Sequence, residues 1–271
     1  MPALAKVIDR RTFLRDMGHG AVAVAIIGLA GCARAPTLSF DPLNYAGNLD
    51  DIESYWCIKD SLPASPIPGL GEPDGSHGLH WGRAGDDRTS GYVLARGGEA
   101  TVVDTGSWCT PDVIEAGLAA VGLGWLAVSS IIVTHKHPDH WVGLSAALER
   151  AADAAVFAGA ADIPHIASVR PIKAVGSGDR VMDLDIIPTP GHTPGHIAVH
   201  DDVAGVLAVG DAVVTKPDGD LTLMPTSEDM AGARASLGAF AGLSFDTLLP
   251  GHGAPIIGGA WDVLTEFLSH N

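Results

Sequence analysis

The segment 134–140, Thr-His-Lys-His-Pro-Asp-His, places three histidines and one aspartate within six residues. Histidine is the commonest neutral metal ligand near neutral pH, and a carboxylate beside it suits zinc, iron or manganese better than an ion that prefers thiolates. The segment follows the apolar run 131–133, which is typical of a buried strand. His135, His137, Asp139 and His140 are therefore predicted to converge on a metal where this strand ends.

Three further potential ligands each follow a separate apolar run. His192 follows residues 186–191, Asp211 follows residues 206–210, and His252 follows residues 248–251. Four junctions between a strand and a loop that each end in a suitable ligand are much harder to obtain by chance than one local motif.

The pattern His-x-His-x-Asp-His, with these three residues in this order downstream, resembles the metal-binding signature of the metallo-β-lactamase superfamily. The resemblance implies two metal sites with one shared ligand. His135, His137 and His192 would hold one metal, Asp139, His140 and His252 a second, and Asp211 would bridge them. The implied cofactors are two divalent ions, with Zn²⁺ expected first and iron or manganese as alternatives.

The resemblance also implies a reaction. Two such ions share a water and lower its pKa from about 15.7 toward 7, which supplies a bridging hydroxide as nucleophile. Asp139 would orient the attacking water and later carry its proton. The chain is therefore expected to be a metallo-hydrolase of an ester, lactone or thioester of a small molecule.

Differences between this sequence and the motifs of particular subfamilies narrow the expected substrate class. Members that hydrolyse lactams carry a Cys or no bridging carboxylate at the position of Asp211, and quorum-quenching lactonases carry a Tyr where this chain has Val214. Relatives that resemble glyoxalase II present basic residues to glutathione, some of them in a C-terminal extension. Because the tail 258–271 contains no Lys or Arg, the glutathione interpretation is weakened.

Two other classes of function stay open. A mononuclear iron dioxygenase of the persulfide dioxygenase type would use the same first site and would carry one iron. The third class is a surface binding protein that is only stabilised by metal. It is the least favoured of the three, because an open site with two metals is costly to assemble without catalytic use.

Several other residues have weaker signals. By the resemblance, Asp104 in Asp-Thr-Gly supports the metal loop from behind by hydrogen bonding, and His196 has a supporting role rather than a ligand role. His77, His80 and Trp81 are interpreted as surface loop residues, with a place lining the pocket as the alternative. Trp141 is interpreted as a pocket wall or core residue and not as a catalyst.

The first 31 residues are interpreted as an export signal. Asp-Arg-Arg-Thr-Phe-Leu-Arg at 9–15 resembles a twin-arginine signal, and the apolar stretch 21–30 is shorter than the about 20 residues that span a bilayer. It ends in Leu-Ala-Gly-Cys, which resembles the site where a signal peptidase cleaves before a lipid-modified Cys32. The mature protein is then expected on the outer face of the cytoplasmic membrane, anchored through Cys32. An ordinary signal with an incidental Cys is the alternative.

Composition divides the remaining chain. Residues 32–76 are rich in Pro, Gly, Asp and Ser and are predicted to form a tether and a loop-rich segment, followed by one domain over 77–271. Cys57 and Cys109 form either a disulfide or two buried thiols. Without residues 1–31, which carry four of the 16 basic and two of the 32 acidic residues, the formal net charge is −18. This charge argues against nucleic acid as substrate or partner, because binding phosphates requires a basic surface.

The spacing of apolar residues predicts a mixture of strands and helices. Strands are expected at 91–95, 100–103, 131–133, 155–157, 180–182, 186–187, 197–199, 205–209 and 248–249, and helices at 111–121, 140–152, 230–240 and 260–268. Asp139 is expected to cap the helix that begins at His140. Pattern alone supports only mixed α/β (α+β) structure, and the resemblance implies the four-layer αββα sandwich of the metallo-β-lactamase fold.

Overall fold

The computed structural model describes residues 80–85, 89–106, 110–216 and 218–270. The export signal, Cys32, Cys57, Cys109 and the boundary near His77 lie outside the described residues, so the predictions made for them stay predictions. In the described part of the chain, no helix has the length and apolar character needed to cross a membrane.

The first sheet has six strands in the order β1-β2-β3-β4-β5-β6. β1 to β3 pair antiparallel, and β4, β5 and β6 continue the sheet in parallel from β3. The bounds are β1 His80–Gly85, β2 Ser90–Arg96, β3 Glu99–Val103, β4 Val128–Val133, β5 Ala155–Gly159 and β6 Ile172–Val175. The predicted hairpin over 91–103 is confirmed by β2 and β3. The expectation that His80 and Trp81 lie in a surface loop is wrong, because both belong to β1, which pairs along its whole length with β2.

The second sheet also has six strands, in the order β14-β13-β10-β9-β8-β7. The bounds are β7 Arg180–Val181, β8 Leu184–Pro188, β9 Ile197–Asp201, β10 Val206–Gly210, β13 Thr247–Pro250 and β14 Ile256–Ile257. β10 and β13 are parallel, and the other neighbours pair antiparallel. A small pair, β11 Val214–Thr215 and β12 Leu221–Thr222, follows β10.

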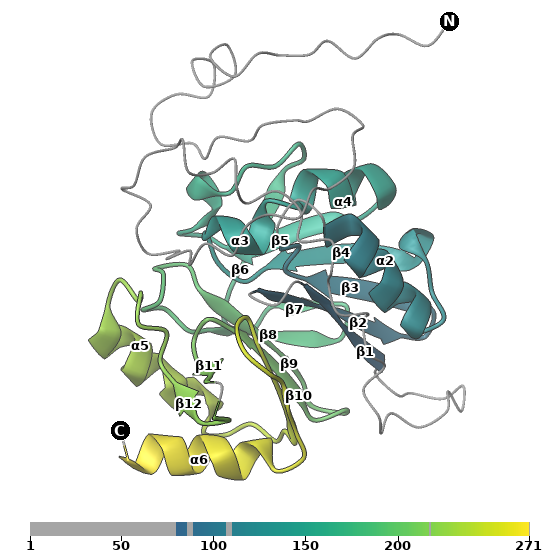
Figure 1. Ribbon diagram of the computed structural model, residues 1–271. Helices are drawn as coiled ribbons and strands as arrows, with labels where there is room; N and C mark the ends of the chain where they lie inside the picture. The colour runs from purple at the N-terminus through teal and green to yellow at the C-terminus, as the bar shows by residue number, and fades with distance from the viewer. Residues whose placement is uncertain (1–79, 86–88, 107–109, 217, 271) are drawn as a thin grey trace, which may run out of the picture. The chain divides into compact units, whose positions relative to one another are not determined.

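Alternating side chains divide the core into three apolar layers. In β2, Val93 points to the helices on the outer face of the first sheet, whereas Tyr92 and Leu94 pack against the second sheet. A third layer lies between the second sheet and its helices, with Phe240 and Leu264 fully buried in it. A strand that is buried on both faces has apolar side chains on both, and the sequence of such a strand is therefore a nearly continuous hydrophobic run. Figure 1 shows the resulting order of helices, sheet, sheet and helices, which confirms the αββα sandwich.

The outer layers contain the helices. On the first sheet they are α2 Thr110–Ala120, α3 Pro138–Trp141 and α4 Leu144–Arg150, and on the second sheet α5 Met230–Ser236, the 3₁₀ turn η4 Leu237–Phe240 and α6 Ala260–His270. The predicted helices at 111–121, 230–240 and 260–268 are therefore confirmed within a few residues.

The expected single helix over 140–152 is wrong, because α3 and α4 are separate. The amide of Gly143 donates to the carbonyl of Gly106 at 2.9 Å and so leaves the helical pattern. His137 occupies the N-cap position of α3, and Asp139 lies in its first turn. Asp139 is thus not the cap, and its carboxylate remains available for other contacts.

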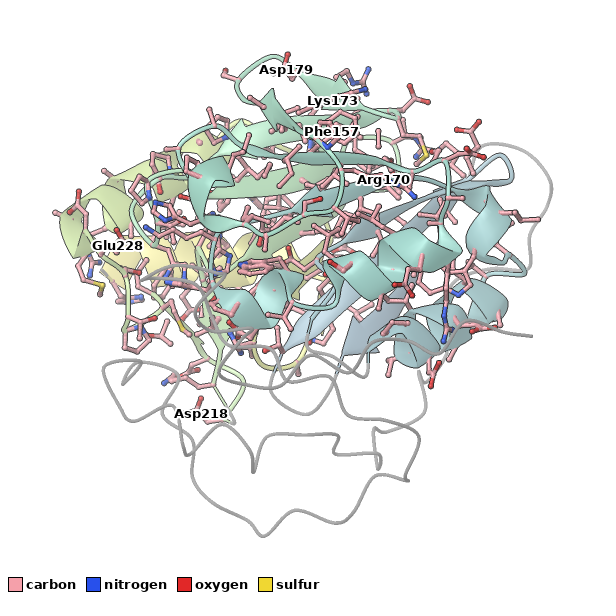
Figure 2. All side chains as sticks on the ribbon, turned by 90° about the horizontal axis from the view of Figure 1, so that it is seen from above. Phe157, Arg170, Lys173, Asp179, Asp218 and Glu228 are labelled. Carbon is pink, nitrogen blue, oxygen red and sulfur yellow. The ribbon has the colours of Figure 1, made fainter. Side chains whose placement is uncertain are left out.

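Arg170, labelled in Figure 2, ties the segment after β5 to the end of α4. Its Nη1 donates to the carbonyls of Ala151 and Ala154 at 3.1 Å, and its Nη2 donates to that of Leu148 at 2.8 Å. Carbonyls at a helix C-terminus lack partners within the helix, so a cation there satisfies them and interacts favourably with the helix dipole.

Arg170→Ala is expected to lower the free energy of unfolding by about 2 kcal/mol, because hydrogen bonds from a charged donor contribute about 1.5–3 kcal/mol. Chemical denaturation measures the change. The control is Arg180→Ala, which removes an exposed ion pair with Asp185 and an exposed hydrogen bond to the Asp183 carbonyl. Because water replaces both contacts, it should change the unfolding free energy by less than about 0.5 kcal/mol. Equal effects of the two substitutions would contradict this assignment.

Candidate metal centre

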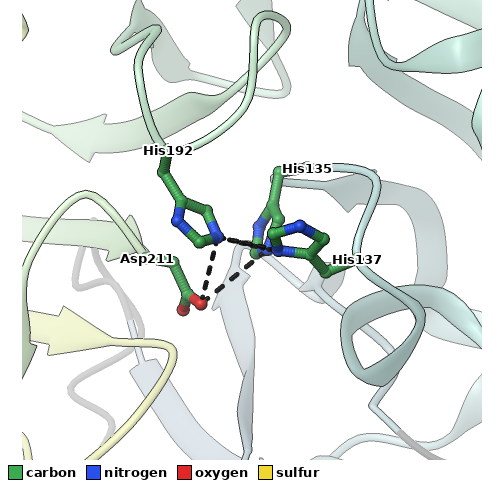
Figure 3. A group of neighbouring side chains, drawn as sticks. All are labelled: His135, His137, His192 and Asp211. Atoms are coloured by element: carbon green, nitrogen blue, oxygen red, sulfur yellow. Dashed lines mark hydrogen bonds and ion pairs between the residues drawn. The ribbon is translucent and has the colours of Figure 1, made fainter. Parts of the chain in front are cut away.

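The first group of potential ligands is His135, His137, His192 and Asp211, shown in Figure 3. His137 Nδ1 lies 2.8 Å from His192 Nε2 and 3.1 Å from His135 Nε2, and the latter two atoms are 3.2 Å apart. Asp211 Oδ2 completes the group at 3.4 Å from His192 Nε2 and 3.8 Å from His135 Nε2. One ligand atom from each of four side chains therefore points to the same small volume.

The second group is Asp139, His140 and His252. Asp139 Oδ2 lies 3.4 Å from His252 Nε2 and 3.7 Å from His140 Nε2. Asp211 contacts this group as well, with Oδ2 at 3.3 Å from His252 Nε2 and Oδ1 at 3.5 Å from His140 Nε2. The Asp211 carboxylate thus lies between the two groups and contacts both.

The strands explain this convergence. Asp211 and His252 follow β10 and β13, which are parallel, so their carboxyl ends meet at one edge of the second sheet. Gly251 allows the close approach there, because a Cβ at this position would lie 2.3 Å from Asp211 Oδ1 and 2.7 Å from His140 Cε1. The carbonyl of Thr134, after β4, accepts from the amide of Ile197 at 2.9 Å and joins this edge to the first sheet.

Two buried atoms indicate that the cavity suits a cation. Within the described residues, His140 Nε2 and Asp211 Oδ1 are buried, lie 3.5 Å apart and form no hydrogen bond. A buried nitrogen and a buried carboxylate oxygen without partners are costly unless something else satisfies them. Imidazole nitrogens and carboxylate oxygens are suitable ligands for zinc, iron and manganese, so the side chains present fit a pair of divalent ions.

Asp104 supports the segment 134–140 from behind, as expected. Its carboxylate accepts from the Thr134 amide, the Thr134 hydroxyl and His140 Nδ1, each at 2.7 Å. The contact with Nδ1 leaves His140 Nε2 directed at Asp211. Asp104 has a φ of +58°, a conformation that aspartate tolerates better than most residues. Such a backbone at a site residue is consistent with a role in holding geometry.

His196 belongs to neither group. Its Nε2 accepts from the Asp211 amide at 3.0 Å, and its Nδ1 lies 2.7 Å from the Thr189 hydroxyl. Both ring nitrogens are therefore occupied by protein partners, which agrees with the supporting role expected for it. Trp141 is buried in the core, and its Nε1 donates to the Lys136 carbonyl at 2.7 Å.

Thr89 is a site residue that the sequence did not indicate. Its hydroxyl donates to Asp139 Oδ2 at 2.9 Å, across 50 positions of sequence. The next residue, Ser90, donates its amide to the Gly251 carbonyl at 2.7 Å. The start of β2 therefore contacts both Asp139 and the loop that contains His252. A single threonine before a strand has no distinguishing pattern, so this role becomes visible only in three dimensions.

Burial and charge give the two groups opposite proton affinities. Burial lowers the pKa of His135, His137 and His192, the last to about 4. Burial opposes protonation of His140 and His252 too, but the carboxylates of Asp211 and Asp139 outweigh it and raise both pKa values, that of His252 to about 10. The three histidines of the first group are therefore neutral at pH 7 and ready to bind a cation, whereas protons compete with a metal for the two histidines of the second group.

Without metal, the protein is expected to be most stable near neutral pH. The histidines with lowered pKa bind fewer protons when folded, so the stability linked to them is lost as the pH falls below about 6.5, for His192 through about pH 4. The stability linked to the raised pKa values of His140 and His252 is fully present below about pH 6.5 and is lost as the pH rises, for His252 through about pH 10. Thermal unfolding of chelator-treated protein from pH 4 to 10 measures both arms. A melting temperature that rises steadily toward acid would contradict the burial of neutral histidines.

Comparison with known proteins agrees with this geometry. The model of the Metallo-beta-lactamase superfamily matches residues 84–252. A hydroxyacylglutathione hydrolase of Cereibacter sphaeroides is 36% identical over 123 residues, which are 43% of this chain and 47% of that protein. One from Pseudomonas fluorescens is 38% identical over 145 residues, or 50% and 52% of the two chains. The chain thus spans about half the length of the curated relatives that it matches.

Solved structures share the fold. The metallo-beta-lactamase family protein TTHA1429 from Thermus thermophilus superposes with a TM-score of 0.54 at 25% identity, covering 71% of this chain and 79% of that one. A metallo beta lactamase from Erythrobacter litoralis gives a TM-score of 0.55 at 20% identity, covering 72% and 92%. At these identities the likeness concerns the arrangement of the two sheets and their helices.

Proposed function

Because the chain belongs to the metallo-β-lactamase superfamily, we propose that it is a metallo-hydrolase that uses two divalent ions, Zn²⁺ first among them, on an ester, lactone or thioester of a small molecule. The observation that carries the proposal is Asp211, whose carboxylate contacts both groups of ligands. His135, His137 and His192 would hold one ion, and Asp139, His140 and His252 the other, with Asp211 shared. When bound, the ions would supply Lewis acidity that activates water at neutral pH and polarises a carbonyl.

Asp139 is the proposed residue for handling the proton. Its side chain is 30% exposed, more than Asp211 at 2%, so a substrate and a water can reach it. Nearby histidines, His140 above all, lower the pKa of Asp139 although burial alone would raise it, and the carboxylate is ionised at neutral pH. An ionised carboxylate held by the Thr89 hydroxyl can accept a hydrogen bond from the attacking water and orient it.

A thioester is the favoured substrate class within this proposal. Hydroxyacylglutathione hydrolases recur among the curated relatives, each matched over about half of its length. The thiol carrier of the substrate is a separate question, because α6 contains neither Lys nor Arg to pair with an anionic carrier. The formal net charge of −16 likewise disfavours polyanionic substrates, nucleic acid included.

A substrate panel tests the proposal. The full chain loaded with Zn²⁺ is assayed on S-lactoylglutathione, S-lactoyl-N-acetylcysteamine, simple esters, lactones, phosphodiesters and sulfate esters. The expected result is turnover of a thioester, with the uncharged N-acetylcysteamine carrier accepted at least as well as glutathione. Turnover confined to phosphodiesters or sulfate esters, or no turnover of any ester, lactone or thioester, would overturn the proposed substrate class.

For localisation, we propose a lipid anchor at Cys32 on the outer face of the cytoplasmic membrane, after export through the twin-arginine signal. The support is the Arg10–Arg11 pair and the Leu-Ala-Gly-Cys motif that ends at Cys32. Cys32→Ala is expected to move the protein from the membrane fraction to the soluble fraction, because the acyl chains would be lost. Fractionation with immunodetection measures this, and a Cys32→Ala protein that remains bound to the membrane would count decisively against the anchor.

A further inference from the structure

Asp162 lies outside both groups of ligands and has no part in the reaction described above. It follows β5 in a turn closed by its own amide, which donates to the Gly159 carbonyl at 3.0 Å. The residue is fully buried. Within the described residues its carboxylate forms no ion pair, so it is not explained by a neighbouring cation. A buried carboxylate is costly and persists only where hydrogen bonds satisfy it.

The partners of this carboxylate come from the two loops that present the three histidines of the first group. Oδ2 accepts from the Lys136 amide at 3.0 Å and from the Thr193 hydroxyl, and Oδ1 accepts from the Gly195 amide at 2.8 Å. Lys136 lies between His135 and His137, and Thr193 directly follows His192. One side chain therefore binds main-chain or side-chain groups adjacent to all three histidines.

The surroundings leave Asp162 little freedom. A Cβ on Gly195 would lie 2.5 Å from the Asp162 amide nitrogen and 2.7 Å from its Cγ, so the two residues are in close contact. The Lys136 peptide is also fixed from its other side, because its carbonyl accepts from Trp141 Nε1 at 2.7 Å. Arg170 holds the far end of the same segment to α4. The carboxylate is thus part of a rigid link and not a mobile group.

We propose that Asp162 is a positioning residue that holds His192 against His135 and His137 and thereby sets the affinity of the first group for its metal. The three histidine nitrogens lie 2.8 to 3.2 Å from one another in a loop pair that has no strand pairing at this point. Hydrogen bonds that orient metal ligands affect affinity, and their loss costs about 10–100-fold. The inference rests on the proposed metal-binding function and adds a residue to it.

Asp162→Asn is the most informative change because it keeps the shape and removes one acceptor. Wherever the amide oxygen is placed, the NH₂ group faces either the Gly195 amide or the Lys136 amide, and two donors then oppose each other. Asp201→Asn is the matched control. Asp201 is also buried, and its Oδ1 accepts from the amides of Val203 and Ala204 at 3.0 and 2.7 Å. Its Oδ2 pairs with Arg96 at 2.6 Å, and it lies at the end of β9 away from His196.

The experiment measures Zn²⁺ affinity of chelator-treated full-length protein by competition with a chromophoric chelator. A His252→Ala background removes a ligand of the second group and lowers its affinity for Zn²⁺. The tight binding that remains is then that of the first group. Asp162→Asn in this background is expected to lower Zn²⁺ affinity by about 10–100-fold, and Asp201→Asn by less than about twofold. Thermal unfolding of the same apoproteins is expected to show comparable destabilisation, which separates metal affinity from general stability.

Thr193 provides a second, milder variant if Asp162→Asn does not fold. Thr193→Val removes one hydroxyl donor to Asp162 and should lower affinity several-fold, whereas Thr193→Ser keeps the hydroxyl and should restore it. An Asp162→Asn affinity within twofold of its parent, or an equal loss in Asp201→Asn, would overturn the inference. A wild-type chain that binds no Zn²⁺ would overturn the proposed function itself.

Discussion

Replacing Asp211 with alanine is expected to lower the metal content from about two ions per chain toward one and hydrolysis by at least about 100-fold. Asp211 is buried, and its two oxygens lie within 3.5 Å of His140, His192 and His252. Its removal leaves both histidine groups in place but deletes the carboxylate that sets their spacing. Metal analysis and steady-state kinetics on the same preparation measure the two effects together.

His196→Ala is the control for this result. His196 contacts the backbone of Asp211 but directs neither nitrogen to a potential metal, so the variant should retain two metals even if it is less stable. An Asp211→Ala protein that keeps two tightly bound metals and hydrolyses near the normal rate would show that Asp211 is not a ligand. The dinuclear mechanism would then have to be abandoned.

Asp139→Asn is expected to lower kcat by about 100-fold or more, in the range found when a positioned acid or base is removed. The amide has nearly the same shape, but it cannot take a proton from water. The first group does not include Asp139, so one metal should remain tightly bound. Steady-state kinetics with metal analysis measures the change.

The matched control for this substitution is Asp112→Asn on the exposed surface of α2, where the side chain is 78% exposed and pairs only with Arg150 among the described residues. It should leave kcat within about twofold. If Asp139→Asn retained kcat within tenfold of the wild type, Asp139 would not handle the proton, and its contact with Thr89 would be purely structural.

The sequence predicted the residues of the centre better than it predicted their support. The resemblance to the family motif indicated seven potential ligands, and the structure brings these seven side chains together in two neighbouring groups. Asp104 was recognised because it belongs to a motif. Thr89 and Asp162 have no such spacing, and their partners lie 26 to 50 positions away. Only the folded chain brings these groups together.

The helices and strands likewise differ in how well the sequence predicted them. The apolar runs 131–133 in β4 and 206–209 in β10 were predicted because buried residues in succession give a strong pattern. The break between α3 and α4 was not, because it depends on the Gly106 carbonyl, 37 positions before Gly143. The two-residue strands β11, β12 and β14 exist through their pairing partners and have no local pattern of their own.

The proposed mechanism requires that this chain hold two metal ions in one shared site. Elemental analysis of the purified full-length protein, with the protein concentration determined independently, tests it most directly. We expect about two ions per chain, as zinc or manganese, with both removed by chelation and restored together with hydrolysis. A single iron per chain, unchanged after incubation with Zn²⁺, would contradict it and would favour the mononuclear dioxygenase instead.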